Sequence, residues 1–339
     1  MIRRNRLVGF SVGLVLVAIL LAFWIHDRRR RAHPNEWPPS PEDTGEYAGS
    51  LIRPSPRYDP SKPPSRPWLD PKQTAPPPAS YHTYAASSIN GQQTDYLLYL
   101  PPGYSDPVNA ARRYPVIYWL HGYAAEPQFG LPFVETLDAA IRAGRVPPMI
   151  AVLPNGLHDS WYVDSVDASQ PIESIIIKDL MPHIDQTYRT IADRRGRAVE
   201  GFSMGGWGAG HLAFKYPDHF CAVTMVSALL YRHDHFPQFQ RIFSGSAAAY
   251  YAEDPITRAH RDADKLKDKV RVRLLAGAND NHFHGLTFAN RFDERLTEWN
   301  YPHELTIIPG VDHNDGEIYQ KLGPAVFDFY KEVFAASQK

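Results

Sequence analysis

The sequence VEGFSMGGWGAG, residues 199–210, places a single serine among five glycines where a short apolar segment meets a helical pattern. Glycine destabilises a regular helix or strand by about 0.5–1 kcal/mol relative to alanine, so this density indicates a backbone with special geometry. Gly201-Phe202-Ser203-Met204-Gly205 fits G-x-S-x-G, in which a sharp strand-to-helix turn exposes a nucleophilic hydroxyl. A glycine-rich turn with an incidental serine is the alternative interpretation of the motif alone.

Apolar segments typical of buried strands alternate with helical patterns on both sides of this motif. The expected strands cover residues 81–88, 94–100, 114–120, 148–154, 197–201, 221–228, 270–277 and 303–310. The expected helices cover residues 131–143, 171–190, 203–216, 288–300 and 317–335. This alternation predicts an α/β fold with a mostly parallel central sheet and helices on both faces. We assign residues 81–337 to one catalytic domain, with the long polar connection 229–268 as a cap over the site.

A serine hydroxyl becomes a good nucleophile only beside a base that a third group orients. In this kind of fold the partners follow the serine in the order acid, then histidine. Asp280 and His313 each come directly after an expected strand, so parallel strands would bring both to the edge that carries Ser203. Asp312 is a poor acid because it adjoins His313. The other candidates are Asp315 as acid and His282, His284 and His303 as bases, of which His303 precedes its strand. We therefore predict a Ser203–Asp280–His313 triad.

Two backbone N–H groups are expected to stabilise the negative oxygen that forms when the serine attacks. One is the amide of Met204, the residue after the nucleophile. The other belongs to the loop after the third strand, where the sequence reads His121-Gly122-Tyr123. Glycine permits a tight turn there, so the amide of Tyr123 is the predicted second donor.

Several of these segments together resemble the esterase D-like family of α/β hydrolases. They are DYLLYLPPGY, RYPVIYWLHGY, VLPNG, SWYVDS, GFSMGGWGA, AGAND and PGVDHND, within residues 81–334. The family includes S-formylglutathione hydrolases, feruloyl and acetylxylan esterases, tributyrin esterases and mycolyltransferases. The resemblance implies that the triad and the two oxyanion donors named above match the family's own. It also places Trp161 and Tyr162 near a substrate pocket, although structural aromatics are an equally good interpretation.

The N-terminal region differs in kind from the rest of the chain. Residues 7–25 carry no charge and, as a helix, would nearly span the roughly 30 Å of a bilayer core. The run ends in FWIHDRRRR, which is a poor signal-peptidase site. We therefore expect a membrane anchor over residues 1–32, followed by a proline-rich spacer over residues 33–80. S-formylglutathione hydrolases usually lack such an anchor, which argues against that particular member of the family.

The charge and cysteine content of the chain indicate which partners and cofactors are not expected. Seven arginines fall in residues 1–33 while the whole chain has a net charge of −1, so the body is acidic and a nucleic-acid partner is not expected. The single cysteine, Cys221, excludes an internal disulfide. Asp280, His282 and His284, or the segment 233–235, could suggest a metal site. Loop histidines are more common than metal ligands, so we expect no metal and no cofactor.

The sequence therefore predicts a membrane-anchored serine esterase that works through an acyl-enzyme on small-molecule, carbohydrate or lipid esters. Two alternatives stay open: acyl transfer to a sugar or lipid alcohol, as in mycolyltransferases, and a non-catalytic binding module. A long spacer suits a body that reaches away from the bilayer, which favours an extracytoplasmic domain. The arginines at 28–31 favour the opposite orientation. The sequence does not indicate an oligomeric state.

Overall fold

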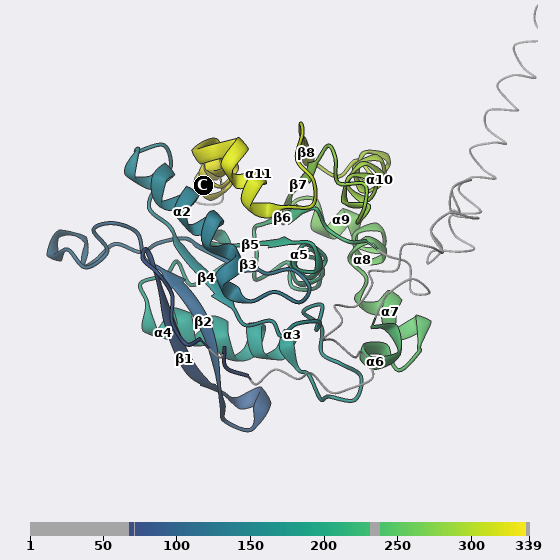
Figure 1. Ribbon diagram of the computed structural model, residues 1–339, viewed down its shortest axis with the longest axis horizontal. Helices are drawn as coiled ribbons and strands as arrows, with labels where there is room; N and C mark the ends of the chain where they lie inside the picture. The colour runs from purple at the N-terminus through teal and green to yellow at the C-terminus, as the bar shows by residue number, and fades with distance from the viewer. Residues whose placement is uncertain (1–67, 71, 231–237, 337–339) are drawn as a thin grey trace, which may run out of the picture. The chain divides into compact units, whose positions relative to one another are not determined.

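The computed structural model describes residues 68–70, 72–230 and 238–336, which all belong to one compact unit (Figure 1). The predicted anchor and residues 33–67 of the predicted spacer lie outside the described residues, as do residues 231–237 of the predicted cap. Among the helices that the structure does describe, none is both long and apolar enough to cross a bilayer. The anchor thus stays a prediction.

A mostly parallel sheet forms the centre of the described part, as predicted. Its strands follow the spatial order β1-β2-β4-β3-β5-β6-β7-β8, with β1 and β2 antiparallel and the pairs from β4 to β8 parallel. The strands are β1 (Ala79–Ala86), β2 (Gln92–Tyr99), β3 (Val116–Leu120), β4 (Ile150–Pro154), β5 (Arg197–Phe202), β6 (Ala222–Val226), β7 (Arg271–Gly277) and β8 (His303–Ile308). Every residue of β3, β4 and β6 is buried, which explains their continuous apolar sequences.

Helices cover both faces of this sheet (Figure 1). They are α2 (Leu131–Arg142), α3 (Ile172–Ser174), α4 (Met181–Thr187), α5 (Met204–Lys215), α6 (Phe239–Phe243), α7 (Ala247–Glu253), α8 (Pro255–Arg261), α9 (Ala263–Leu266), α10 (Gly285–Glu298), α11 (Asp315–Leu322) and α12 (Asp328–Ala336). A large apolar cluster joins α2, α11 and α12 to one face of β3 and β4, with Trp119, Phe133 and Tyr319 among its members. Helix α5 packs on β5 and β6.

Two expected helices are interrupted. The helix expected over residues 317–335 is split into α11 and α12 by a 3₁₀ turn at Gly323–Phe327. Gly323 has a φ of 55°, and the following proline cannot donate a helical hydrogen bond, so the chain changes direction there. The helix expected over residues 171–190 ends at Thr187 and contains a π-helical stretch, Ile175–Leu180, between α3 and α4.

Candidate active site

Ser203 lies at a sharp turn between β5 and α5. Its φ of 59° and ψ of −116° lie in a region that non-glycine residues rarely adopt, at a cost of about 1–3 kcal/mol. Positions 201 and 205 require glycine, because backbone atoms of other residues lie where a β-carbon would be. A β-carbon on Gly201 would come within 3.0 Å of the Gly205 oxygen, and one on Gly205 within 3.0 Å of the Leu120 oxygen. The motif therefore forms a tight elbow, and this elbow is pressed against the end of β3.

The structure brings His313 and Asp280 to this serine. The Nε2 atom of His313 lies 2.9 Å from Ser203 Oγ, and its Nδ1 atom lies 2.8 Å from Asp280 Oδ2. Asp280 is fully buried, and Ser203 is only 4% exposed. The three side chains follow the carboxyl ends of β5, β7 and β8, so the parallel sheet gathers residues that are up to 110 positions apart in sequence. The resulting chain of contacts runs from hydroxyl to imidazole to carboxylate.

The rival acids and bases lie elsewhere. Asp312 is exposed and accepts a hydrogen bond from the backbone N–H of His313 at 2.8 Å. His303 begins β8 and lies 3.0 Å from Asp293 Oδ1, at the amino end of the strand. His284 occupies the N-cap position of α10 without a side-chain capping hydrogen bond, and burial lowers its pKa. Burial raises the pKa of the remaining rival acid, Asp315, to about 6 at the start of α11. None of these four contacts the serine hydroxyl through a described hydrogen bond.

Two phenylalanines that we did not predict flank the imidazole of His313. The rings of Phe202 and Phe283 each have their centroid 4.6 Å from that of His313. Phe202 is the variable residue before the motif serine, and Phe283 comes from the loop after Asp280. Packing on both rings restricts how far the imidazole can turn. The sequence did not indicate this role of Phe202, because the G-x-S-x-G pattern accepts any residue at position 202.

The loop His121-Gly122-Tyr123 runs directly beside the serine. A β-carbon on Gly122 would lie 3.4 Å from Ser203 Cβ and 3.2 Å from the ring of Phe202. His121 is buried, and its Nε2 accepts the backbone N–H of Gly156 at 3.0 Å. Its Nδ1, 2.9 Å from the Gly122 oxygen, must therefore carry the proton and donate. The tautomer of His121 thus helps to hold this loop in place.

Met204 is the first residue of α5, a position whose N–H has no partner within its own helix. It follows Ser203 directly, and Tyr123 follows the glycine that touches Ser203. The two residues predicted as oxyanion donors therefore belong to the two segments that meet at the nucleophile. Burial raises the pKa of the Tyr123 side chain to about 12, against the effects of Arg241 and Gln238.

Trp161 and Tyr162 support the site from inside. Both have positive φ angles, 55° and 61°, and both are fully buried. The hydroxyl of Tyr162 donates to the backbone oxygen of His121 at 3.0 Å, and its ring occupies the space left by Gly208. The indole N–H of Trp161 donates to Gln238 Oε1 at 2.6 Å. With no exposed surface on either ring, the structure favours structural aromatics over pocket-lining residues.

The described part of the predicted cap contacts the loop that contains these aromatics. Arg241, in α6, donates to Asp159 Oδ2 at 2.6 Å and to its backbone oxygen at 2.7 Å. Burial raises the pKa of Asp159 to about 6, and the charge of Arg241 opposes this rise. The backbone N–H of Val166 donates to the Ile242 oxygen at 2.8 Å. The segment from Gln238 onward is therefore anchored on the loop that carries Asp159 and Trp161.

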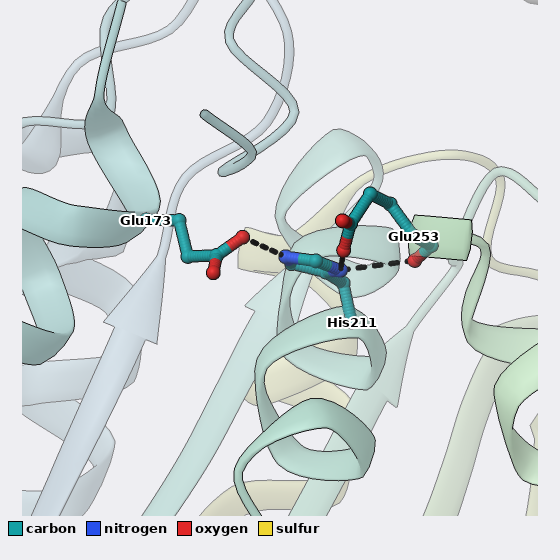
Figure 2. Close-up of side chains that lie close together, drawn as sticks. All are labelled: Glu173, His211 and Glu253. Carbon is teal, nitrogen blue, oxygen red and sulfur yellow. Dashed lines mark hydrogen bonds and ion pairs between the residues drawn. The ribbon is translucent and has the colours of Figure 1, made fainter. Parts of the chain in front are cut away.

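Figure 2 shows Glu173, His211 and Glu253, the only set of three or more potential metal ligands close together within the described residues. His211 Nε2 lies 2.8 Å from Glu173 Oε2, while Nδ1 on the other side of the ring lies 2.9 Å from the Glu253 backbone oxygen. Lys215 Nζ lies 2.9 Å from Glu173 Oε2 and 2.7 Å from Glu253 Oε2. The lysine supplies the cation that both carboxylates need, so we interpret the group as an ion-pair cluster joining α3, α5 and α7.

The alternative metal site with the pattern D-x-H-x-H is not assembled among the described residues. Asp280, His282 and His284 do not form a metal-binding group among the residues that the structure describes. Asp280 instead contacts His313, and the ring of His282 packs on Phe283 with centroids 4.8 Å apart. The second alternative, residues 233–235, lies outside the described residues.

The fold and the strained serine beside a histidine–aspartate pair define a serine hydrolase domain of the α/β-hydrolase class. The chain belongs to the Esterase family, whose model, described as "Putative esterase", matches residues 87–329. The class of this domain is therefore serine esterase.

Two relatives share about a third of the aligned residues. The chain is 30% identical over 256 residues to an esterase of Mycobacterium tuberculosis strain H37Rv, covering 68% of this chain and 54% of that protein. It is 31% identical over 141 residues to an endo-1,4-beta-xylanase/feruloyl esterase of Xylanibacter ruminicola, covering 40% of this chain and 19% of that protein. The chain thus spans about half of the first relative's length and about a fifth of the second's.

Solved structures with the same fold include a ferulic acid esterase, with a TM-score of 0.64 and 22% identity over 75% of this chain and 98% of that one. An S-formylglutathione hydrolase from Agrobacterium tumefaciens has a TM-score of 0.63 and 16% identity over 76% of this chain and 95% of that one. At these identities the likeness concerns the fold alone, and it supports the predicted α/β-hydrolase architecture.

Proposed function

We propose that this protein hydrolyses carboxylic esters through an acyl-enzyme on Ser203. The observation that carries the proposal is the pair of contacts made by His313, 2.9 Å to the serine hydroxyl and 2.8 Å to Asp280. His313 takes the hydroxyl proton as Ser203 Oγ bonds to the ester carbonyl carbon. The same proton passes to the alkoxide as the alcohol leaves. Water then attacks the acyl-enzyme and gives a proton to His313, which passes it to Ser203 Oγ as the acid is released.

Asp280 and the oxyanion loop have complementary roles in this scheme. The buried carboxylate accepts from His313 Nδ1, which keeps the Nε2 lone pair directed at the serine and stabilises the imidazolium that forms. The amides of Met204 and Tyr123 are proposed to receive the negative oxygen of the tetrahedral intermediate. Loss of one such donor costs about 2.7–4 kcal/mol of barrier.

The substrate class is proposed as a small-molecule, carbohydrate or lipid ester, in line with the feruloyl esterases among the relatives. The test is a panel of p-nitrophenyl esters of increasing acyl length, followed by acetylated and feruloylated sugars. Hydrolysis by the wild type, absent in Ser203→Ala, is expected. Fluorophosphonate labelling of the wild type but not the variant checks the nucleophile separately. A wild-type protein that neither hydrolyses any ester nor reacts with the fluorophosphonate would refute the proposal.

We further propose that residues 7–25 anchor the protein and that the catalytic domain faces away from the cytoplasm. The support is the uncharged run and the proline-rich segment that follows it. Protease added to intact cells or spheroplasts should cut within residues 63–78 and release an active fragment. Cleavage that occurs only after the membrane is broken would place the domain in the cytoplasm.

A further inference from the structure

We propose that Tyr319 is a positioning residue whose hydroxyl holds together the three chain segments that carry the active site. Tyr319 is fully buried in α11. Its hydroxyl accepts the indole N–H of Trp119 at 2.9 Å and donates to Glu200 Oε1 at 2.7 Å. A tyrosine hydroxyl has one proton to donate, so the bond to the carboxylate uses that proton. The inference rests on the proposed esterase function.

Each of these three residues lies a few positions from a residue of the proposed active site. Trp119 lies in β3, four residues before Tyr123 of the oxyanion loop. Glu200 lies in β5, three residues before Ser203. Tyr319 itself follows His313 by six residues, in the helix that this loop leads into. One hydroxyl therefore connects the oxyanion strand, the nucleophile strand and the helix behind the catalytic histidine.

The surroundings make these bonds strong and directional. Glu200 is 1% exposed; burial raises its pKa, and Arg273, whose Nη2 lies 3.5 Å from Glu200 Oε2, opposes this rise together with the two tyrosine hydroxyls. Hydrogen bonds to a carboxylate in such a water-free setting are stronger than those between neutral groups. The ring of Tyr319 is fixed as well, because Phe133 packs edge-on against it with centroids 5.6 Å apart. Neither end of the connection can shift without leaving a buried polar group unpaired.

Loss of the Tyr319 hydroxyl would remove the hydrogen bonds from α11 to both strands at once. The indole N–H of Trp119 would lose its acceptor, and Glu200 would lose one donor. Small displacements matter here, since about 1 Å of misplacement at reacting groups can cost about 100-fold in rate. We expect the displacement to change the alignment of His313 with Ser203, and so the chemical step rather than substrate binding.

Tyr330 provides a matched control. Its hydroxyl also bonds to Glu200, at Oε2, and to a second strand through Thr224 Oγ1 at 2.9 Å. Thr224 lies in β6, which leads to no proposed catalytic residue, and Tyr330 lies in α12, beyond the break at Gly323–Phe327. Tyr319→Phe and Tyr330→Phe each remove one buried hydroxyl between the same carboxylate and a neighbouring strand.

The experiment compares both variants in the full-length chain with p-nitrophenyl acetate and a fluorophosphonate probe. Tyr319→Phe should lower kcat at least tenfold, with KM near the wild-type value, and should slow labelling of Ser203 to a similar extent. Tyr330→Phe should lower the Tm comparably but keep kcat within about twofold of wild type. Equal kcat in the two variants would overturn the inference and leave Tyr319 a structural residue. An inactive wild type would instead count against the proposed function.

If Tyr319→Phe does not fold, Trp119→Phe tests the same connection from the other strand. It removes the indole N–H donor from β3, together with part of a buried ring, and keeps the bond between Tyr319 and Glu200. A drop in kcat of several fold at unchanged KM is expected, because the oxyanion loop follows this strand. A folded Trp119→Phe with wild-type kcat and wild-type labelling rate would overturn the proposal.

Discussion

Gly205 and Leu120 are in such close contact that no side chain fits between them: a β-carbon on Gly205 would lie within 3.0 Å of the Leu120 carbonyl oxygen. Gly205 is the second residue of α5, and Leu120 ends β3, directly before the proposed oxyanion loop, residues 121–123. The nucleophile and the proposed oxyanion donors thus lie on two segments whose backbones touch. The contact between these two backbone segments therefore fixes the position of the nucleophile relative to the proposed oxyanion donors.

Gly205→Ala is therefore expected to destabilise the protein by several kcal/mol, because backbone must move to admit the methyl group. Gly144→Ala is the control: its β-carbon would meet nothing within 4 Å, but its φ of 66° still disfavours alanine, by about 1 kcal/mol. Chemical denaturation of both variants gives the comparison. Equal stability of the two variants would contradict the tight elbow.

Replacement of Ser203 separates activity from backbone strain. Ser203→Ala and Ser203→Gly should both lose ester hydrolysis by about 10⁶-fold in kcat, since each removes the nucleophile. Glycine, however, tolerates the φ of 59° at this position and alanine does not. Ser203→Gly should therefore be more stable than Ser203→Ala, by about 1 kcal/mol. Urea unfolding and rate measurements on the two proteins check both points. If Ser203→Gly were less stable than Ser203→Ala, the backbone at position 203 would not be strained.

Asp280→Asn is expected to lower kcat by about 10⁴-fold, because an amide can stabilise the wrong tautomer of His313. Asp312→Asn is the control, since the exposed Asp312 side chain contacts only the backbone N–H of His313 among the described hydrogen bonds. Its kcat should stay within a few fold of wild type. The acid assignment fails if the two variants exchange these outcomes in steady-state assays.

Glu173 should make stability depend on pH. Burial raises the pKa of Glu173, but the hydrogen bond and charge of His211, together with bonds from Lys215 and Tyr216, outweigh burial and hold the pKa below its ordinary value. Such a carboxylate stabilises the fold above its unfolded pKa, and the contribution is lost as pH falls through the folded value. Glu173→Gln should thus cost on the order of 3 kcal/mol at pH 7.

The difference between wild type and Glu173→Gln should shrink below about pH 4.5, where the unfolded-state carboxyl begins to take up protons. Asp264→Asn is the control, because Asp264 pairs with Lys267 at the surface, where water and salt screen the interaction. Its effect on stability should be much smaller at every pH. Denaturation curves between pH 3 and pH 7 that stay parallel for Glu173→Gln and wild type would show that the charge contributes nothing.

The alternation of strands and helices along the chain and the three residues at strand ends could be predicted because the information is local. Ser203 lies within a short motif, and Asp280 and His313 each directly follow an apolar strand, so topology alone brings them to one edge. The break of the C-terminal helix at Gly323 could also have been predicted, because glycine followed by proline commonly ends a helix. Apolar residues continue beyond it, and the helix expected over residues 317–335 did not take the break into account.

Other parts of the site depend on contacts that no local pattern encodes. Phe283 reaches His313, and Trp161 reaches Gln238, only after separate loops have folded against each other. The hydrogen bond from Tyr319 to Glu200 spans 119 positions. In each case the side chain is an ordinary aromatic in the sequence, and its role follows from the partner that tertiary packing supplies.

The positive φ of Ser203 has a consequence for how this sequence would drift if its activity were no longer selected. Folding favours glycine at position 203, and the need for a nucleophile opposes it. At positions 201 and 205, by contrast, folding itself demands glycine, because a methyl group would meet backbone. In a mutant library selected for folded protein alone, serine should give way to glycine at 203 while its two neighbours persist. The order of decay would then distinguish the residues kept by chemistry from those kept by shape.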